Sequence, residues 1–244
     1  MRSHMPNYRG LDIPFVDFGG GVTSDSLFCD KEQPLFDFYE AAGKAGRYRR
    51  ALDIGANIGI HSMIMARQGW TVRAFEPDRK HYVWLLANLQ RNRIGLCHED
   101  HPYFDTGPYL GAVSDAPGRA TFVRVKGNTT GSHLEGDKRP YGDLERFTVD
   151  VVDCRPLLAW ADFAKIDCEG GEARILLTVQ HDCRCEFMIE VGTLENAEAI
   201  YGHFAGRRGM WAQKIGWKPV RGLGDMPAHH NHGALFIGRE PPFK

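Results

Sequence analysis

From Ala51 onward the sequence alternates between short apolar segments and longer segments in which apolar residues recur at helical spacing. The short segments are rich in β-branched and aromatic residues, as buried strands are. Repeated strand–helix units favour a parallel sheet with helices on both faces, because parallel strands need crossover connections. We therefore predict a doubly wound, mostly parallel α/β sheet. Its expected strands are 51–54, 71–75, 163–166 and 187–191, and its expected helices are 58–68, a helix that begins after Asp78, 172–179 and 194–204.

The middle of the chain departs from this alternation. Residues 109–113 are typical of one further strand. After Gly118, the segments 121–125 and 147–151 alternate like strands, and they enclose a polar, glycine-rich stretch at 127–142. This pattern predicts a β-hairpin-like insertion with a mobile loop.

The two ends of the chain are expected to flank the alternating region. At the C-terminal end, 217–220 and 234–237 are expected to pair as an antiparallel hairpin. Residues 1–50 are rich in turn formers and are expected to form a flank or lid with one helix, in front of a ligand-binding domain at 51–244. Met1–His4 resembles a cloning scar and is left out of the reasoning.

Charge and cysteine content narrow the possible partners and compartment. The 244 residues carry a formal net charge of −1, which argues against a nucleic-acid partner. No apolar run approaches the ~20 residues that a membrane-spanning helix needs, so no membrane contact is expected. The six cysteines show no C-x-x-C spacing, and no signal peptide precedes them. We therefore expect reduced cysteines and a cytoplasmic protein, of open oligomeric state.

The first predicted strand runs into the sequence Asp53-Ile-Gly-Ala-Asn-Ile-Gly59. Gly55 suits a tight turn with positive φ, and Gly59 allows close packing where the next helix begins. Asn57 occupies the position where dinucleotide-binding turns usually carry glycine, which disfavours a pyrophosphate beside the backbone. Glu76 ends the next strand, about 20 residues further on, where a carboxylate can accept the hydrogens of a ribose diol. The pattern favours a nucleoside ligand without phosphates.

Four motifs in this order resemble the FkbM-type methyltransferase family. The resemblance runs from about Ala51 to Val191, with weaker support to Ile237. It departs at Gly171, where the family often has a small apolar residue. The four motifs are Asp53–Gly59, Phe75-Glu76-Pro77, Ala112-Val113-Ser114-Asp115 followed by Gly118, and Lys165-Ile166-Asp167-Cys168-Glu169-Gly170 with Glu172 close behind.

The resemblance implies a Rossmann-like class I methyltransferase fold, S-adenosylmethionine as the methyl donor, and usually methylation of a hydroxyl. Glu76 would hold the ribose hydroxyls, with Pro77 beside it in the cofactor-binding set. Ser114 or Asp115 would lie near the adenine. The residues that would line the methionine and ribose part of the donor are Asp53, Gly55, Asn57 and Gly59.

Acidic residues crowd the end of the predicted strand that follows the insertion. Methyl transfer from a sulfonium needs the acceptor held in line, and a hydroxyl acceptor also needs a base. We expect Asp167 to be that base, Lys165 to orient it, and Glu169 to position the acceptor or a helix start. Glu172 also faces the expected cleft or caps the following helix, and Glu190 reaches the cleft from the next strand.

Metal binding is not predicted. Asp167 and Glu190 together would also suit a divalent cation, but the sequence places no third carboxylate beside them. The histidines at 229, 230 and 232 have no nearby cysteine and are more typical of a polar turn than of a zinc site.

The sequence therefore predicts a methyltransferase that acts on a hydroxyl of a small metabolite or a glycan. A nicotinamide-dependent oxidoreductase is one alternative, and Asn57 argues against it. A non-catalytic nucleoside-binding module is another, and the acids at 167 and 169 argue against that. Nucleic-acid methylation is disfavoured by the near-neutral charge.

Overall fold

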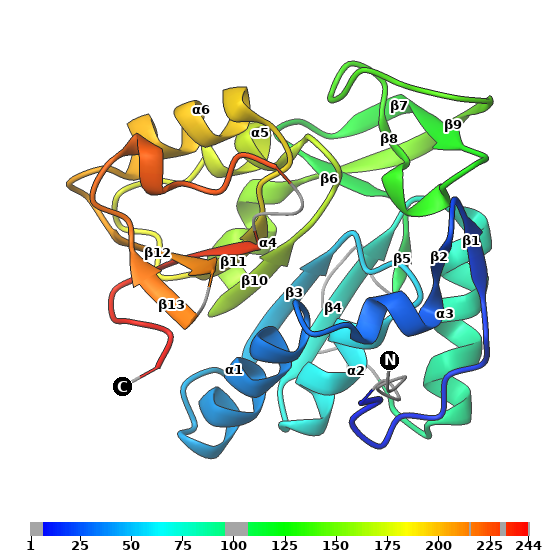
Figure 1. Cartoon of the computed structure of the whole chain (residues 1–244), viewed down its shortest axis with the longest axis horizontal. Coiled ribbons are helices and arrows are strands. Elements are labelled where there is room, and N and C mark those ends of the chain that lie inside the picture. The colour runs from blue at the N-terminus through cyan, green and yellow to red at the C-terminus, as the bar shows by residue number, and fades with distance from the viewer. Residues whose placement is uncertain (1–6, 96–106, 215, 230–232, 244) are drawn as a thin grey trace, which may run out of the picture.

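The predicted parallel strands are confirmed. A computed structural model of the chain describes residues 7–95, 107–214, 216–229 and 233–243. In its central sheet, the five neighbouring strands that begin with Tyr109–Leu110 at one edge and end with Glu186–Glu190 run parallel (Figure 1). The next strand, Ala234–Gly238, is antiparallel to both of its neighbours. The spatial order is β13 (Gly216–Pro219), β12 (Gly209–Lys214), β14 (Ala234–Gly238), β11 (Glu186–Glu190), β10 (Phe163–Ile166), β3 (Arg50–Ile54), β4 (Thr71–Glu76) and β5 (Tyr109–Leu110).

Helices cover both faces of this sheet, because its strands bury alternate side chains on opposite sides. Phe163 and Met188 belong to one buried cluster, together with side chains of α1 (Gln33–Lys44), α2 (Ile60–Arg67) and α3 (Arg79–Arg91). Ala164, Phe187 and Ile189 belong to the other cluster, with side chains of α4 (Cys154–Trp160), α5 (Glu172–Leu176) and α6 (Leu194–Phe204). The chain is thus a doubly wound α/β protein.

The apolar residues of α3 predict an inner face made of Val83, Leu85, Leu86 and Leu89, and the structure confirms only part of it. Leu85 and Leu89 are buried, but Val83 is 56% exposed and Leu86 is 42% exposed. The buried line of the helix instead runs through His81 and Asn88. No helix in the described ranges is long and apolar enough to cross a membrane.

A second, smaller sheet forms the insertion. It contains, in spatial order, β6 (Ala112–Ser114), β9 (Leu144–Asp153), β7 (Gly118–Val125) and β8 (His133–Leu134), with the short helix η2 (Thr129–Gly131) before β8. β7 and β9 pair antiparallel, as the expected hairpin requires. The single strand expected at 109–113 is divided, since β5 joins the main sheet and β6 the small one. The division falls at Gly111, whose N–H donates to the carbonyl of Glu76.

The expected C-terminal hairpin is present, but its partners differ. β13 pairs with β12, and β14 lies between β12 and β11. The pairing of 217–220 with 234–237 is therefore wrong, because β12 was not recognised as a strand. Every residue of β14 is buried, which a strand inside a sheet requires, whereas β13 forms the more exposed edge.

The N-terminal segment packs against the sheet and reaches the insertion. It contains β1 (Asp17–Gly19), β2 (Val22–Thr23), the short helix η1 (Ser24–Phe28) and α1. Phe36, Phe38 and Tyr39 of α1 are fully buried in the same cluster as β3 and α2. A Cβ on Gly19 would lie 2.6 Å from the carbonyl oxygen of Gly127, so this segment touches the insertion directly. The domain boundary at residue 50 stays a prediction, and Met1–His4 lies outside the described residues.

Candidate active site

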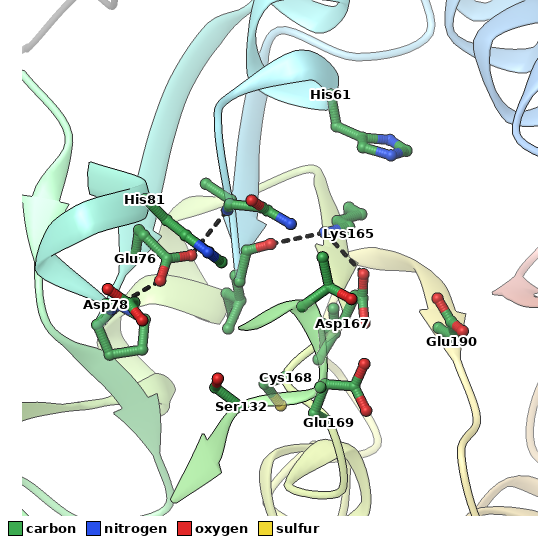
Figure 2. Close-up of a pocket in the computed structure, with 18 of the residues that line it drawn as sticks. His61, Glu76, Asp78, His81, Ser132, Lys165, Asp167, Cys168, Glu169 and Glu190 are labelled. Carbon is green, nitrogen blue, oxygen red and sulfur yellow. Dashed lines mark hydrogen bonds and ion pairs between the residues drawn. The ribbon is translucent and has the colours of Figure 1, made fainter. Parts of the chain in front are cut away.

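A cavity of about 480 Å³ lies at the carboxyl ends of β3, β4, β10 and β11. Its size is typical of small-molecule sites, and this edge is where doubly wound sheets bind ligands. Besides the strand ends, the N-terminal segment and the insertion contribute to its wall. Figure 2 shows Glu76, Asp78 and His81 on one side, Asp167, Glu169 and Glu190 on the other, and Lys165 between them. We call these two sides the Glu76 side and the acidic side.

The turn after β3 brings backbone to the floor of the cavity. Gly55 has a φ of +76°, and a Cβ there would lie 1.8 Å from the carbonyl oxygen of Asp167. Asn57 has a φ of 52°, a left-handed conformation that asparagine tolerates better than most residues. Gly59 has a φ of +88° and sits against Leu85 of α3. The turn is therefore in close contact with the loop after β10.

Glu76 is the buried carboxylate of the Glu76 side. It is 5% exposed and accepts the backbone N–H groups of Asn57 and Asp78, each at 2.7 Å. Burial raises the pKa of Glu76 to about 8, although these two hydrogen bonds oppose the shift. The side-chain oxygen of Asn57 is buried beside it and accepts no hydrogen bond within the described chain. This side therefore offers acceptors to a ligand that carries O–H or N–H donors.

Lys165 connects the turn after β3 to the acidic side of the cavity. Its Nζ donates to the carbonyl oxygen of Gly55 at 2.8 Å, and it lies 3.4 Å from Asp53 and 3.3 Å from Asp167. Burial alone would lower the pKa of Lys165, but these two carboxylates hold it above its ordinary value. Asp53 is fully buried and accepts the Ser62 hydroxyl at 2.6 Å. Lys165 is thus a charged link that fixes the geometry of both neighbours.

The acidic side combines carboxylates from the loop after β10, from β11 and from the N-terminal segment. Glu169, at a φ of 58°, is ion-paired with Lys138 at 2.5 Å, and burial followed by the charge of Asp167 raises its pKa. Burial, then the charges of Asp167 and Glu32, raise the pKa of Glu190 well above its ordinary value. The three expected acids, 167, 169 and 190, therefore do line one cavity.

Glu172 serves the loop between β10 and α5 and does not line the cavity. Its carboxylate accepts the N–H groups of Cys168 and Gly170 and an N–H of the Asn196 side chain. It is 1% exposed, and this burial raises its pKa to about 7. Neither expected role is seen, because the carboxylate does not line the cavity and binds the loop before α5, whose N-cap Gly171 has no side-chain cap. This carboxylate holds the loop that presents 167 and 169.

Several cavity residues were not expected from the sequence. Glu32 lies 3.4 Å from His61, and the other ring nitrogen of His61 lies 3.0 Å from the hydroxyl of Tyr39. From the insertion, Lys138 reaches Glu169, and Thr129 contacts His81 at 2.9 Å. Glu32, Lys138 and Thr129 lie outside the α-helices and strands, and only their long-range contacts reveal their place, so the sequence offered no signal for them. His61 directly follows the glycine turn, and its position there left open whether it faces the donor or packs.

Of the eight expected cofactor residues, four line the cavity and four do not. Gly55, Asn57, Glu76 and Pro77 line the cavity. The remaining four, Asp53, Gly59, Ser114 and Asp115, lie behind its wall or beside it, and their roles stay predictions. Gly111, Ala112 and Val113, just before the last two of these, do line it.

In the part of the chain that the structure describes, no three His, Cys, Asp or Glu side chains form a group that could hold a metal ion. Asp167 and Glu190 therefore gain no third metal ligand there. Of the predicted histidine turn, residues 230–232 lie outside the described residues.

Comparison with known proteins identifies a family. A model described as "Methyltransferase FkbM domain" matches residues 53–207. No curated protein matches in sequence. Similar solved structures include an O-methyltransferase from Bacillus cereus in complex with SAH (12% identity, 84% of this chain and 79% of that chain, TM-score 0.41). Another is a precorrin 8w decarboxylase from Methanobacterium thermoautotrophicum (12% identity, 84% and 88%, TM-score 0.43). Likenesses of this degree carry no argument about substrate.

Proposed function

Because the chain belongs to the FkbM methyltransferase family, we propose that this S-adenosylmethionine-dependent methyltransferase methylates a hydroxyl oxygen of a small metabolite or a glycan. Membership of this family leaves the nicotinamide-dependent oxidoreductase and the non-catalytic module without support. The substrate and the residue roles below are proposals that rest on the cavity.

The Glu76 side fits the donor. When bound, S-adenosylmethionine supplies a methyl group activated by a sulfonium. Glu76 would hold the two ribose hydroxyls, since a carboxylate has lone pairs left after accepting two N–H groups. The unpartnered side-chain oxygen of Asn57 suits an N–H donor of the same ligand. We place the adenine beside 111–113, which line the cavity there.

The acidic side of the cavity supports the proposal about the acceptor. Glu32, Asp167, Glu169 and Glu190 all lie on its wall, together with the lysines Lys31, Lys138 and Lys165. Carboxylates gathered in this way raise one another's pKa and favour an acceptor that brings hydrogen-bond donors and no phosphate or carboxylate group of its own. A hydroxyl can donate to these carboxylates and lose its proton there. This convergence is the observation that best supports a hydroxylated, non-anionic acceptor.

Two measurements test the proposal. S-adenosylmethionine and S-adenosylhomocysteine should raise the melting temperature, with about 2.7 kcal/mol of stabilisation at 100 times the dissociation constant, whereas NAD should not. Radiolabelled methyl transfer should then be measured to a panel of polyols, monosaccharides and phenols and to the phosphorylated form of each. We expect methyl ethers, and transfer to the unphosphorylated member of each pair. Methylation of nitrogen or sulfur, or preference for phosphorylated acceptors, would contradict the proposal.

A further inference from the structure

Glu190 differs from the other carboxylates of the cavity wall in having no partner. Its side chain makes no hydrogen bond or ion pair with any residue that the structure describes. Glu76 accepts two backbone N–H groups. The remaining wall carboxylates are each paired with a cationic or ionisable side chain: Glu32 with His61, Asp78 with Arg124, Asp137 with Arg174, Asp167 with Lys165, and Glu169 with Lys138.

Proton uptake by the other groups of the acidic side would break these pairs. A proton on Asp167 would weaken its ion pair with the buried Lys165 at 3.3 Å. A proton on Glu169 would do the same to Lys138 at 2.5 Å. Removing one partner's charge from such a partly buried pair is unfavourable, because the other charge loses its partner while it stays partly desolvated. His61 has both ring nitrogens engaged, one with Tyr39 and one with Glu32.

Proton uptake by Glu190 breaks no such pair and removes a repulsion. The charged groups that face it are Asp167 and Glu169 from the loop after β10, Glu32 from the N-terminal segment, and Lys165 from β10. On its other side, Glu190 pairs in register with Ala234 of β14, whose side chain is apolar. The three negative charges outnumber the one positive charge, so the neutral form of Glu190 is favoured. A carboxyl whose neutral form is favoured in this way is suited to hold a proton during a reaction.

We propose that Glu190 is the catalytic residue that accepts the proton of the acceptor hydroxyl, and that Asp167, held by Lys165, is a positioning residue. The inference rests on the proposed methylation of a hydroxyl. In the step, the hydroxyl proton passes to a carboxylate oxygen of Glu190 while the hydroxyl oxygen bonds to the methyl carbon. The carbon–sulfur bond breaks, and its electron pair stays on sulfur. The products are a methyl ether, a neutral thioether and protonated Glu190, which returns its proton to solvent.

The first test reads the proton directly and needs no acceptor. Protein labelled with ¹³C at the glutamate side-chain carboxyl and saturated with S-adenosylhomocysteine is titrated by NMR. Glu190→Gln assigns the resonance, and Glu198→Gln, an exposed change on α6, is the control. We expect Glu190 to titrate well above the ordinary glutamate pKa of about 4.3. Titration at that ordinary value would overturn the proposal.

The second test uses turnover with the hydroxylated acceptors of the panel. We expect Glu190→Gln to lower kcat at least about 100-fold, with the KM for S-adenosylmethionine unchanged, and to remove the rise of kcat with pH. Glu190→Asp should restore part of the rate and the pH limb, and Asp167→Asn should keep that limb. A Glu190→Gln enzyme with wild-type kcat would overturn the role of Glu190 alone. A wild type that methylates no hydroxyl would overturn the proposed function, while the NMR result still decides whether Glu190 holds the exchangeable proton.

Discussion

At the scale of single residues, Glu76 shows how one carboxylate can shape a turn and also be available to a ligand. Its oxygens accept the N–H groups of Asn57 and Asp78, which fixes the end of β4 against the turn after β3. The same carboxylate faces the cavity (Figure 2). Its burial keeps water from competing for its remaining lone pairs, so a ligand hydroxyl there would form a charge-assisted hydrogen bond.

We predict that Glu76→Ala raises the dissociation constant of S-adenosylhomocysteine more than about tenfold, on the scale of a lost charge-assisted contact. Isothermal titration calorimetry measures this, and Glu76→Gln, which keeps the shape and one acceptor oxygen, should lose less. The pKa of Glu76 is raised to about 8 in the free protein. If Glu76 holds the ribose hydroxyls as proposed, its ionised form is the one that binds, so wild-type affinity should rise from pH 6 to pH 8, and Glu76→Gln should lose this rise. An unchanged dissociation constant in both variants would remove Glu76 from the ribose site.

Residue types at strand ends were predictable, and their partners were not. Gly55, Asn57, Glu76 and Glu190 follow or end strands, and the carboxyl ends of parallel strands meet at one edge of the sheet. The cation beside Glu169 comes from Lys138, whose loop has no periodic pattern that places it. The sequence therefore indicates the acids of the site, while the pairing that distinguishes Glu190 from them depends on the folded chain.

At the scale of elements, the turn between β3 and α2 has no room for a side chain. Gly55 and Gly69 have similar backbone conformations, with φ of +76° and +81°. A Cβ on Gly55 would meet the Asp167 carbonyl oxygen at 1.8 Å, whereas a Cβ on Gly69 would have nothing within 4 Å. A side chain at Gly69 would therefore cause backbone strain alone, whereas a side chain at Gly55 would cause the same strain and a steric clash.

We predict that Gly69→Ala lowers the free energy of unfolding by about 1–2 kcal/mol, the strain of a left-handed alanine. Gly55→Ala should cost clearly more, because the turn or the loop after β10 must move as well. Urea unfolding of both variants measures the difference. Equal losses would show that the turn does not depend on its contact with the Asp167 carbonyl.

Long, strongly patterned elements were predictable from the sequence, and short ones were not. β3, β10 and β11 are buried on both faces, and such strands give continuous apolar runs. β5 and β6 have two and three residues, too few to show that they belong to different sheets. β12 was missed because its sequence, Gly-Met-Trp-Ala-Gln-Lys, has no clear period, and its place beside β14 is a tertiary contact.

At the scale of the whole molecule, the N-terminal segment belongs to the core as well as to the cavity. Phe38 is fully buried and packs against Phe163 and Phe236 of the sheet. Phe15, in the same segment, is 69% exposed. Burial of this kind joins α1 to the central sheet, so this segment does more than cover the site.

We predict that Phe38→Ala lowers the free energy of unfolding by about 3–5 kcal/mol, the usual loss for a truncated core aromatic residue. Phe15→Ala should change it by less than about 0.5 kcal/mol, as exposed substitutions do. Thermal and urea unfolding compare the two variants. A small effect of Phe38→Ala would mean that the N-terminal segment is a detachable lid.

The wall of the cavity comes from stretches that lie far apart along the chain: the turn after β3 on one side, and the insertion and N-terminal segment on the other. Substitutions in the insertion or the N-terminal segment can therefore accumulate while the turn after β3 stays the same. Exchanging residues 127–142 between relatives, with the turn after β3 left unchanged, is therefore expected to change the acceptor preference while donor binding stays the same.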